Sequence, residues 1–225
     1  MVDFEQITKG INIKPNKGAF GYASITLLKD GNENILFDTG SYGVRNVIKD
    51  LLKKEKIDKL FISHLHFDHC SNLDLFRNSK IYINEKELKN LFENNEDCDL
   101  YKPLLKIINE YDVNTFKDEI NISNNIKTVL TYGHTAGHSS LEFKQGKRRI
   151  LVAGDAIKSL NDYLNSKCMV NENFYWGEGD IRAMRNCKQT LTDVYNRMLK
   201  NGLTKNVYVV QQLKDIVNRL DKLVR

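Results

Sequence analysis

The chain is poor in features that mark several classes of protein. Only two of its 225 residues are proline and hydrophobic residues make up 41%, which excludes a disordered or proline-rich chain. No stretch approaches the roughly 18 apolar residues that a membrane-spanning helix needs. Met1 to Gly10 also lack the pattern of a secretory signal. We therefore expect a cytoplasmic protein with no membrane partner.

Cysteine is scarce and irregularly placed. The four cysteines are widely spaced and form no CxxC pair. Thiols placed in this way are expected to stay free in a reducing compartment. They are Cys70, Cys98, Cys168 and Cys187.

An excess of charge of one sign is also missing. The net charge is +5, from 34 basic and 29 acidic residues. The basic runs are short, such as Lys53-Lys54 and Lys147-Arg148-Arg149. A nucleic-acid-binding protein usually gathers its basic residues into a patch. Charge therefore does not argue for RNA or DNA as a substrate, although a nucleic acid stays open as an alternative partner to a small molecule.

The pattern of short strands and helices predicts one α/β domain spanning residues 1–225. No internal repeat or low-complexity linker divides the chain. The expected strands are 23–28, 34–37, 59–63, 81–83, 119–122, 126–132, 139–144, 149–153 and 206–210. The expected helices are 44–52, 85–94, 99–111, 179–200 and a final one carrying the apolar stripe of 213–223. This order suits two packed sheets with helices covering their outer faces.

Histidine is rare but concentrated. Three of the five histidines and one aspartate fall within residues 64–69, directly after an apolar run that resembles a buried strand. On a regular strand, His64, His66 and Asp68 would share one face. On a loop at the strand end, neighbouring ligands can diverge toward two metal ions. Imidazole and carboxylate are natural ligands for zinc and similar cations, so this segment predicts a metal site.

Residues 64–69 match the HxHxDH signature, and the chain resembles the metallo-β-lactamase superfamily. Further landmarks of that family follow in the same order. Asp38-Thr39-Gly40 resembles its early Asp-Thr-Gly turn, and Gly133 to His138 resembles its Gly-His-Thr-Pro-Gly-His turn. Gly154-Asp155 resembles the turn that supplies a bridging carboxylate. The resemblance implies a four-layer αβ/βα sandwich with two metal ions along the sheet edges.

The resemblance also implies roles for individual residues. The first metal ion would be held by His64, His66 and His134, the second by Asp68 and His69, and Asp155 would bridge them. A hydroxide between the ions would be the nucleophile, and Asp68 would orient it or help protonate the leaving group. Asp38 would either fix a ligand through hydrogen bonds or serve as a turn residue. For His138, a structural hydrogen-bonding role is preferred over ligation.

The C-terminal part departs from the family pattern. The family supplies one more histidine to the second metal ion, but this chain has no histidine after His138. Gln211 and Gln212 stand at the equivalent place, and a glutamine oxygen is a poorer ligand for zinc than imidazole. We therefore expect two divalent ions, zinc first with iron or manganese as alternatives, and a weaker second site.

The residues in and next to these motifs resemble those of N-acyl-homoserine-lactone lactonases and glyoxalase II-like thioesterases. That lactonase branch carries a tyrosine where this chain has Lys158, which could stabilise an oxyanion or simply be solvated. The segment 174–176 could form an apolar lid or pack on the core. We expect a hydrolase acting on a small ester, thioester or lactone. A phosphodiesterase related to ribonucleases and a metal-binding protein without activity are the alternatives.

Overall fold

The computed structural model describes residues 1–13, 20–95, 101–132, 134–146, 148–157 and 207–209. Its larger sheet has six strands in the order β1-β4-β5-β6-β7-β8. Strands β1, β4 and β5 pair antiparallel, whereas β5 to β8 pair in parallel. The strands are β1 Val2–Thr8, β4 Ile25–Asp30, β5 Glu33–Phe37, β6 Lys59–Phe61, β7 Lys80–Asn84 and β8 Val113–Phe116.

The second sheet has four strands in the order β12-β11-β10-β9. Strands β9 to β11 form an antiparallel meander, and β12 adds to β11 in parallel. They are β9 Ile126–Leu130, β10 Ser139–Gln145, β11 Arg148–Val152 and β12 Val207–Val209. A separate two-stranded ribbon pairs β2 Ile11–Ile13 with β3 Phe20–Tyr22.

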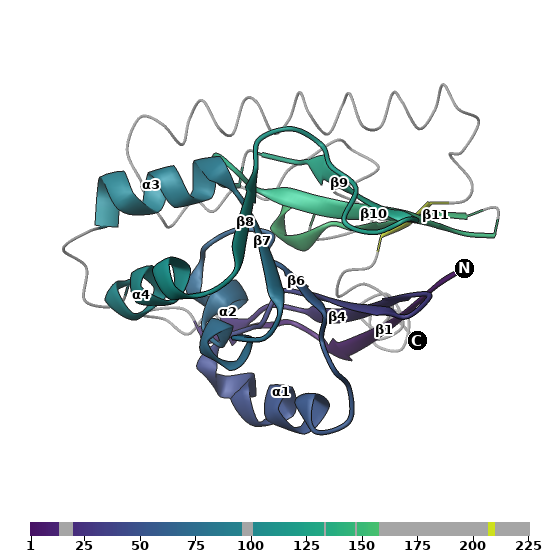
Figure 1. The fold of residues 1–225 in the computed structure, drawn as a ribbon, viewed down its shortest axis with the longest axis horizontal. Helices are drawn as coiled ribbons and strands as arrows, with labels where there is room; N and C mark the ends of the chain where they lie inside the picture. The colour runs from purple at the N-terminus through teal and green to yellow at the C-terminus, as the bar shows by residue number, and fades with distance from the viewer. Residues whose placement is uncertain (14–19, 96–100, 133, 147, 158–206, 210–225) are drawn as a thin grey trace, which may run out of the picture.

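The described helices flank the larger sheet. They are α1 Arg45–Leu52, α2 Phe67–Cys70, α3 Glu85–Asn95 and α4 Lys102–Glu110. Figure 1 shows α1 on the side of this sheet that faces away from β9 to β11. In α1 the predicted apolar spacing buries Ile48 and Leu51, while Val47 stays 42% exposed. The helices predicted over 179–200 and 213–223 lie outside the described residues.

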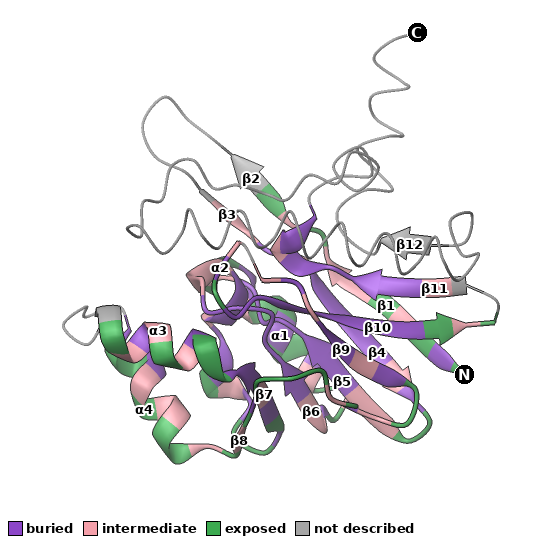
Figure 2. Cartoon of the chain, turned by 90° about the horizontal axis from the view of Figure 1, so that it is seen from above, coloured by how far each residue is buried: buried purple, intermediate pink, exposed green. Residues whose placement is uncertain are grey.

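Two apolar clusters hold these layers together. Strand β5 shows how they arise, because successive side chains point to opposite faces of a sheet. Leu36 packs in the cluster that includes the helices, whereas Ile35 and Phe37 pack in the cluster that joins the two sheets. In that second cluster Phe37 stacks on Phe61 with ring centroids 5.5 Å apart. Figure 2 shows the strands between the layers as buried and the outer faces of α3 and α4 as largely exposed.

The strand predicted over 119–122 is wrong, and β1, β2, β3 and the strand at Val113–Phe116 were not among those predicted. Ile122 N–H donates to the Ile126 carbonyl at 2.8 Å, and Asn121 forms only an isolated bridge to Lys127. The segment is therefore a turn folded back on β9. Its alternating isoleucines pack inward as a strand's would, with Ile122 in the cluster between the sheets. The other strand predictions, including 206–210, are confirmed within a few residues.

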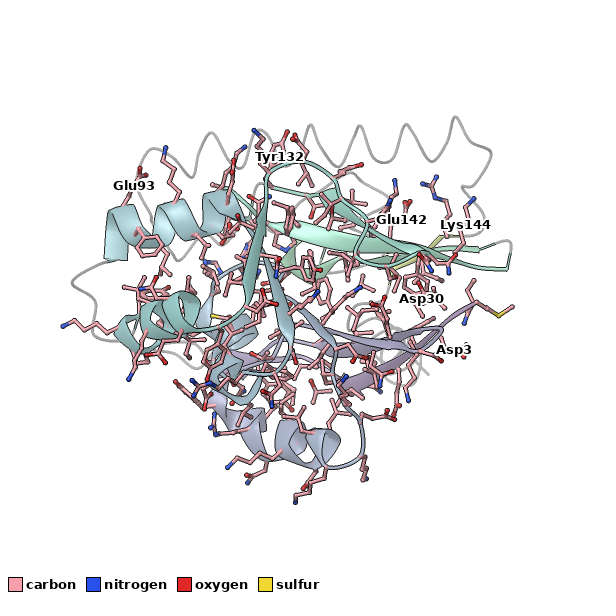
Figure 3. The ribbon with its side chains drawn as sticks, viewed as in Figure 1. Asp3, Asp30, Glu93, Tyr132, Glu142 and Lys144 are labelled. Atoms are coloured by element: carbon pink, nitrogen blue, oxygen red, sulfur yellow. The ribbon has the colours of Figure 1, made fainter. Side chains whose placement is uncertain are left out.

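The ends of the sheets that lie away from Asp38 are joined by Asp30, the last residue of β4. Its carboxylate accepts hydrogen bonds from Ser123 Oγ at 2.6 Å, from Asn125 N at 2.9 Å and from Asn125 Nδ2 at 2.8 Å. Burial raises the pKa of Asp30, but these hydrogen bonds outweigh burial and hold the pKa below its usual value. In the view of Figure 3, Asp30 is labelled at the same end of the sandwich as Lys144 of β10, away from Tyr132 beside the turn that follows β9.

No helix among the described residues is long and apolar enough to cross a membrane.

Candidate metal centre

The polar segments predicted to share a site meet where strands of both sheets end. Asp38 follows β5, and its N–H donates to the Phe61 carbonyl of β6 at 2.9 Å. Ser63 and His64 follow β6, and Ser139 at the start of β10 donates to the Ser63 carbonyl at 3.0 Å. Asp155 lies in the short 3-10 helix η3 Gly154–Ala156 directly after β11. The two sheets therefore contribute side chains to one edge of the sandwich.

The histidine-rich segment follows the loop alternative and not a continuous strand. His66 has an extended backbone and stands at the N-terminus of α2, which contains Asp68 and His69. The change from extended to helical backbone turns consecutive side chains in different directions. The strand reading, which put His64, His66 and Asp68 on one face, is therefore wrong, and the segment supplies side chains to two groups of ligand atoms.

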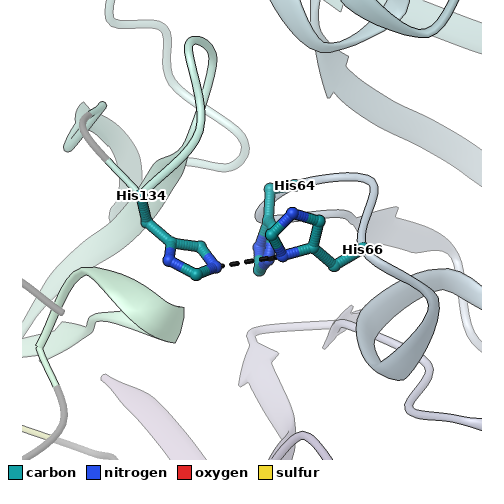
Figure 4. Close-up of side chains that lie close together, drawn as sticks. All are labelled: His64, His66 and His134. Carbon is teal, nitrogen blue, oxygen red and sulfur yellow. Dashed lines mark hydrogen bonds between the residues drawn. The ribbon is translucent and has the colours of Figure 1, made fainter. Parts of the chain in front are cut away.

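The first group consists of the imidazoles of His64, His66 and His134, whose nitrogens converge (Figure 4). His66 Nδ1 lies 2.9 Å from His64 Nε2 and 3.0 Å from His134 Nε2. Ligand nitrogens about 2.0–2.1 Å from a tetrahedral zinc ion lie roughly 3.3 Å apart, so this spacing fits one ion. Burial, together with the other imidazoles, lowers the pKa of His66 to about 3, and the pKa of His64 is also well below its usual value. Neutral imidazoles keep the lone pairs that a metal requires.

The second group brings His69 and Asp155 together beside His64. His69 Nε2 lies 3.4 Å from Asp155 Oδ1, while Asp155 Oδ2 lies 3.5 Å from His134 Nε2. One carboxylate thus points an oxygen at each group, as a bridging ligand requires. His69 Nε2 is buried and has no hydrogen-bond partner among the described residues, which also fits a nitrogen that ligates a metal.

Asp68 lies near this second group but outside its tight contacts. Its Oδ2 is 3.8 Å from His69 Nε2, and its side chain is 45% exposed. The side chain of Asp155, in contrast, is 17% exposed. Asp68 is therefore the carboxylate of the cluster most accessible to solvent and substrate.

Asp38 orients the second group from beneath. It is fully buried and accepts hydrogen bonds from Ser63 N and Ser63 Oγ, both at 2.8 Å, and from His69 Nδ1 at 2.7 Å. Among the described non-glycine residues it alone has a positive φ, of 61°, which marks a strained backbone at a functional site. Ser63 Oγ also lies 3.0 Å from His64 Nδ1. Because the Nδ1 atoms of both histidines are engaged, their Nε2 atoms face the centre. Asp38 therefore makes the hydrogen bonds that the ligand-fixing interpretation requires.

His138 has the structural role preferred for it. Its Nδ1 lies 2.9 Å from Thr131 Oγ1, and its Nε2 accepts a hydrogen bond from Asp155 N at 3.1 Å. Gly154 leaves room for this contact, because a Cβ there would lie 2.9 Å from His138 Nε2. His138 thus fixes the backbone that carries Asp155.

Glu87 was missed by the sequence reasoning. It lies in the first turn of α3 and is buried, and its carboxylate contacts both histidine-bearing loops. Oε2 accepts a hydrogen bond from Leu65 N at 3.0 Å, and Oε1 accepts from Thr135 Oγ1 at 2.5 Å and Gly137 N at 2.7 Å. In sequence, Asn84 followed three residues later by Glu87 matches a helix capping box, a pattern that hides this long-range role.

A cavity of about 280 Å³ borders the other face of α2. Phe67 and Cys70 line it from α2, opposite His69 at 100° per residue, and Leu104 and Ile107 line it from α4. Arg45 also lines the cavity, but its guanidinium pairs with both oxygens of Asp74 at 2.7 and 2.5 Å. Cys70 is a free, buried thiol, as predicted.

Several predicted features lie outside the described residues. They are Lys158, the segment 174–176, Gln211, Gln212, Cys98, Cys168 and Cys187.

Imidazoles and carboxylates gathered at the strand ends of a two-sheet sandwich define the class of metallo-hydrolases. The sequence model of the metallo-beta-lactamase superfamily matches residues 18–198. The chain therefore belongs to this superfamily, has its αβ/βα fold and is a hydrolase of that fold.

Individual relatives extend this result. A Methanocaldococcus jannaschii protein named as a probable metallo-hydrolase is 29% identical over 147 residues, covering 61% of this chain and 69% of that protein. A ribonuclease Z of Pediococcus pentosaceus is 42% identical over 57 residues, but the match covers only 25% of this chain and 18% of the ribonuclease. The crystal structure of a quorum-quenching N-acyl homoserine lactone hydrolase aligns with a TM-score of 0.69 at 16% identity. That alignment covers 95% of this chain and 92% of the hydrolase. At such low identity it supports the fold alone.

Proposed function

We propose that this protein hydrolyses a small ester, thioester or lactone with two divalent ions, zinc first among the candidates. The observation that carries the proposal is the pair of ligand groups sharing Asp155, whose two oxygens lie 3.4 Å from His69 Nε2 and 3.5 Å from His134 Nε2. We assign His64, His66 and His134 to the first ion, Asp68 and His69 to the second, and Asp155 to both. Ions bound there supply Lewis-acid chemistry, which lowers the pKa of water and polarises a carbonyl oxygen.

The side chains themselves orient the reactants. Asp68, which solvent reaches, would hold the attacking water and pass a proton to the leaving group. Asp38 and Ser63 keep the imidazoles of His64 and His69 turned toward the centre. Because these supports are buried, the ligand nitrogens are ordered before substrate arrives.

A carbonyl substrate is supported by a solved neighbour of the same fold, which is named as an N-acyl homoserine lactone hydrolase. The ribonuclease Z match keeps a phosphodiester as the second candidate, although it covers a small part of that protein.

A substrate panel tests the proposal. The protein, loaded in turn with zinc, manganese and iron, is assayed with aryl esters, lactones, thioesters and bis-aryl phosphates. We expect turnover of a carbonyl substrate and its loss in His134→Ala, with Glu85→Gln on the exposed face of α3 as the control. Turnover of the phosphate diester alone would overturn the substrate class. An activity that His134→Ala leaves unchanged would not come from this site.

A separate experiment tests the expectation that the two ions bind with different affinities. Three imidazoles converge on the first position, whereas the second relies on His69, Asp155 and the partly exposed Asp68, and Gln211 and Gln212 replace a histidine in sequence. Competition with a zinc chelator should resolve two affinities, the tighter one being lost in His134→Ala. Release of two equally tight ions would contradict this assignment.

A further inference from the structure

Glu87 stands out because it is a buried carboxylate that no ligand assignment uses. It is 4% exposed, and its two oxygens accept three hydrogen bonds. None of the donors belongs to its own helix. One is the backbone of Leu65, between His64 and His66, and the other two belong to the turn that carries His134.

This arrangement connects the two segments that supply the first ligand group. Leu65 N–H fixes the loop after β6 in the six-stranded sheet, and Thr135 and Gly137 fix the turn that leads into β10 in the four-stranded sheet. The imidazoles of His66 and His134, 3.0 Å apart, stand on opposite sides of this connection. One further hydrogen bond, from Ser139 N–H to the Ser63 carbonyl at 3.0 Å, joins the residues that flank these two segments.

Gly137 gives independent support for a close docking of the turn on α3. A Cβ at Gly137 would lie 2.8 Å from Glu87 N and 2.9 Å from both Asn84 Oδ1 and Glu87 Cγ. Only a glycine lets the turn approach the start of α3 this closely. Asn84 Oδ1 in turn accepts a hydrogen bond from Lys86 N at 3.0 Å and secures that end of the helix.

We infer that Glu87 is a positioning residue that sets the geometry of the first metal site by tying the His64–His66 loop to the His134 turn. The inference rests on the proposed function for the identity of that site. Glu87 reaches neither Asp68 nor His69 through these hydrogen bonds, so its influence falls mainly on the first ion. Asp38 has the corresponding part for the second group.

The test compares Glu87→Gln with Glu85→Gln, an exposed carboxylate two residues earlier on the same helix. An amide at position 87 keeps the volume, but its NH2 group faces at least one of the N–H donors, so one of the two segments is released. In competition with a chelator, the affinity for the more tightly bound zinc ion should be about tenfold lower in Glu87→Gln than in the wild type. Loss of a hydrogen-bond partner that supports a metal ligand has an effect of this size. The weaker step should not change, and Glu85→Gln should match the wild type.

Two further measurements make the test independent of activity and of folding. Amide hydrogen exchange at Leu65 and Gly137 should be faster in Glu87→Gln. Thr135→Val removes one hydrogen bond, leaves Glu87 in place and should weaken the tight step by about threefold, within the spread for single hydrogen bonds.

The outcomes separate the two proposals. If the wild-type protein binds no divalent ion, the proposed function fails. If the wild type binds zinc in two steps and Glu87→Gln and Thr135→Val bind it equally well, the function stands and the role of Glu87 is refuted. Equal weakening of both steps would also refute it, because it would mark a general loss of stability.

Discussion

Two buried carboxylates join the sheets at opposite ends of the sandwich, and they differ in what they stabilise. Asp30 and Glu87 each accept three hydrogen bonds, including one from a hydroxyl and at least one from a backbone N–H. At Asp30 the hydrogen bonds outweigh burial and the pKa is lowered. At Glu87 burial outweighs the hydrogen bonds and the pKa is raised.

The two carboxylates differ in the balance between burial and hydrogen bonding. A lowered pKa means that the folded protein favours the charged form of Asp30, so its contacts stabilise the fold. A raised pKa means that the charged form of Glu87 is held at a cost. The proposed positioning role accounts for a carboxylate kept at this cost at position 87, whereas Asp30 stabilises the fold.

Removal of the metal ions should have the largest effect on activity, and its effect on hydrogen exchange should be confined to the end of the sandwich that carries the metal centre. A strong chelator should lower hydrolysis about a thousandfold or more, because the Lewis-acid contribution is worth several kcal/mol. Hydrogen exchange should then quicken at Leu65 and Gly137 but not at Asn125. An equal increase in the exchange rate at Asn125 would show that the two ends of the sandwich are coupled, which would contradict the contrast between them.

Asp38→Asn should weaken the second ion by about 10- to 100-fold, the range for loss of an outer partner of a ligand. An amide cannot accept all of the hydrogen bonds that Asp38 takes from Ser63 and His69. Zinc–chelator competition measures the effect. Asp58→Asn is the control, because the Asp58 carboxylate also accepts a backbone hydrogen bond, from Asn34, away from the site. A change confined to the affinity for the more tightly bound ion would contradict our assignment of Asp38 to the second ion.

Asp30→Asn should leave both zinc affinities unchanged and lower the free energy of unfolding by about 1–3 kcal/mol. The loss arises because the amide replaces an oxygen that accepts from Ser123 or Asn125 with a donor. Urea unfolding of the metal-free protein measures it. A variant as stable as the wild type would show that the far end needs no carboxylate.

The smallest expected effect is the pH dependence of that loss. The folded-state pKa of Asp30 lies below the unfolded value of about 3.9, so its contribution is complete above the unfolded pKa and disappears as pH falls through the folded pKa. The difference in the free energy of unfolding between wild type and Asp30→Asn should be constant from about pH 5 to about pH 7 and should shrink below about pH 4. A difference that grows on acidification would have the wrong sign.

Much of the fold and of the candidate site could be predicted because the signals are local. Apolar runs ending in polar residues predicted β5, β6 and β11, and the spacing of residues 64–69 indicated the candidate ligands. The short strand β8 is exposed at Thr115 and lies at the edge of its sheet, so only its pairing with β7 defines it. Glu87 could not be predicted, because its partners lie far away in the sequence and its spacing from Asn84 already fits a helix cap.

The parallel pairing of β12 with β11 has a consequence for synthesis of the chain. Strands β9, β10 and β11 are successive hairpin partners, so they can form as soon as they emerge from the ribosome. Strand β11 then has an open edge until Val207–Val209 have been made. The strand that leads into Asp155 thus keeps an edge open to pairing with another nascent chain until the later strand β12 covers it.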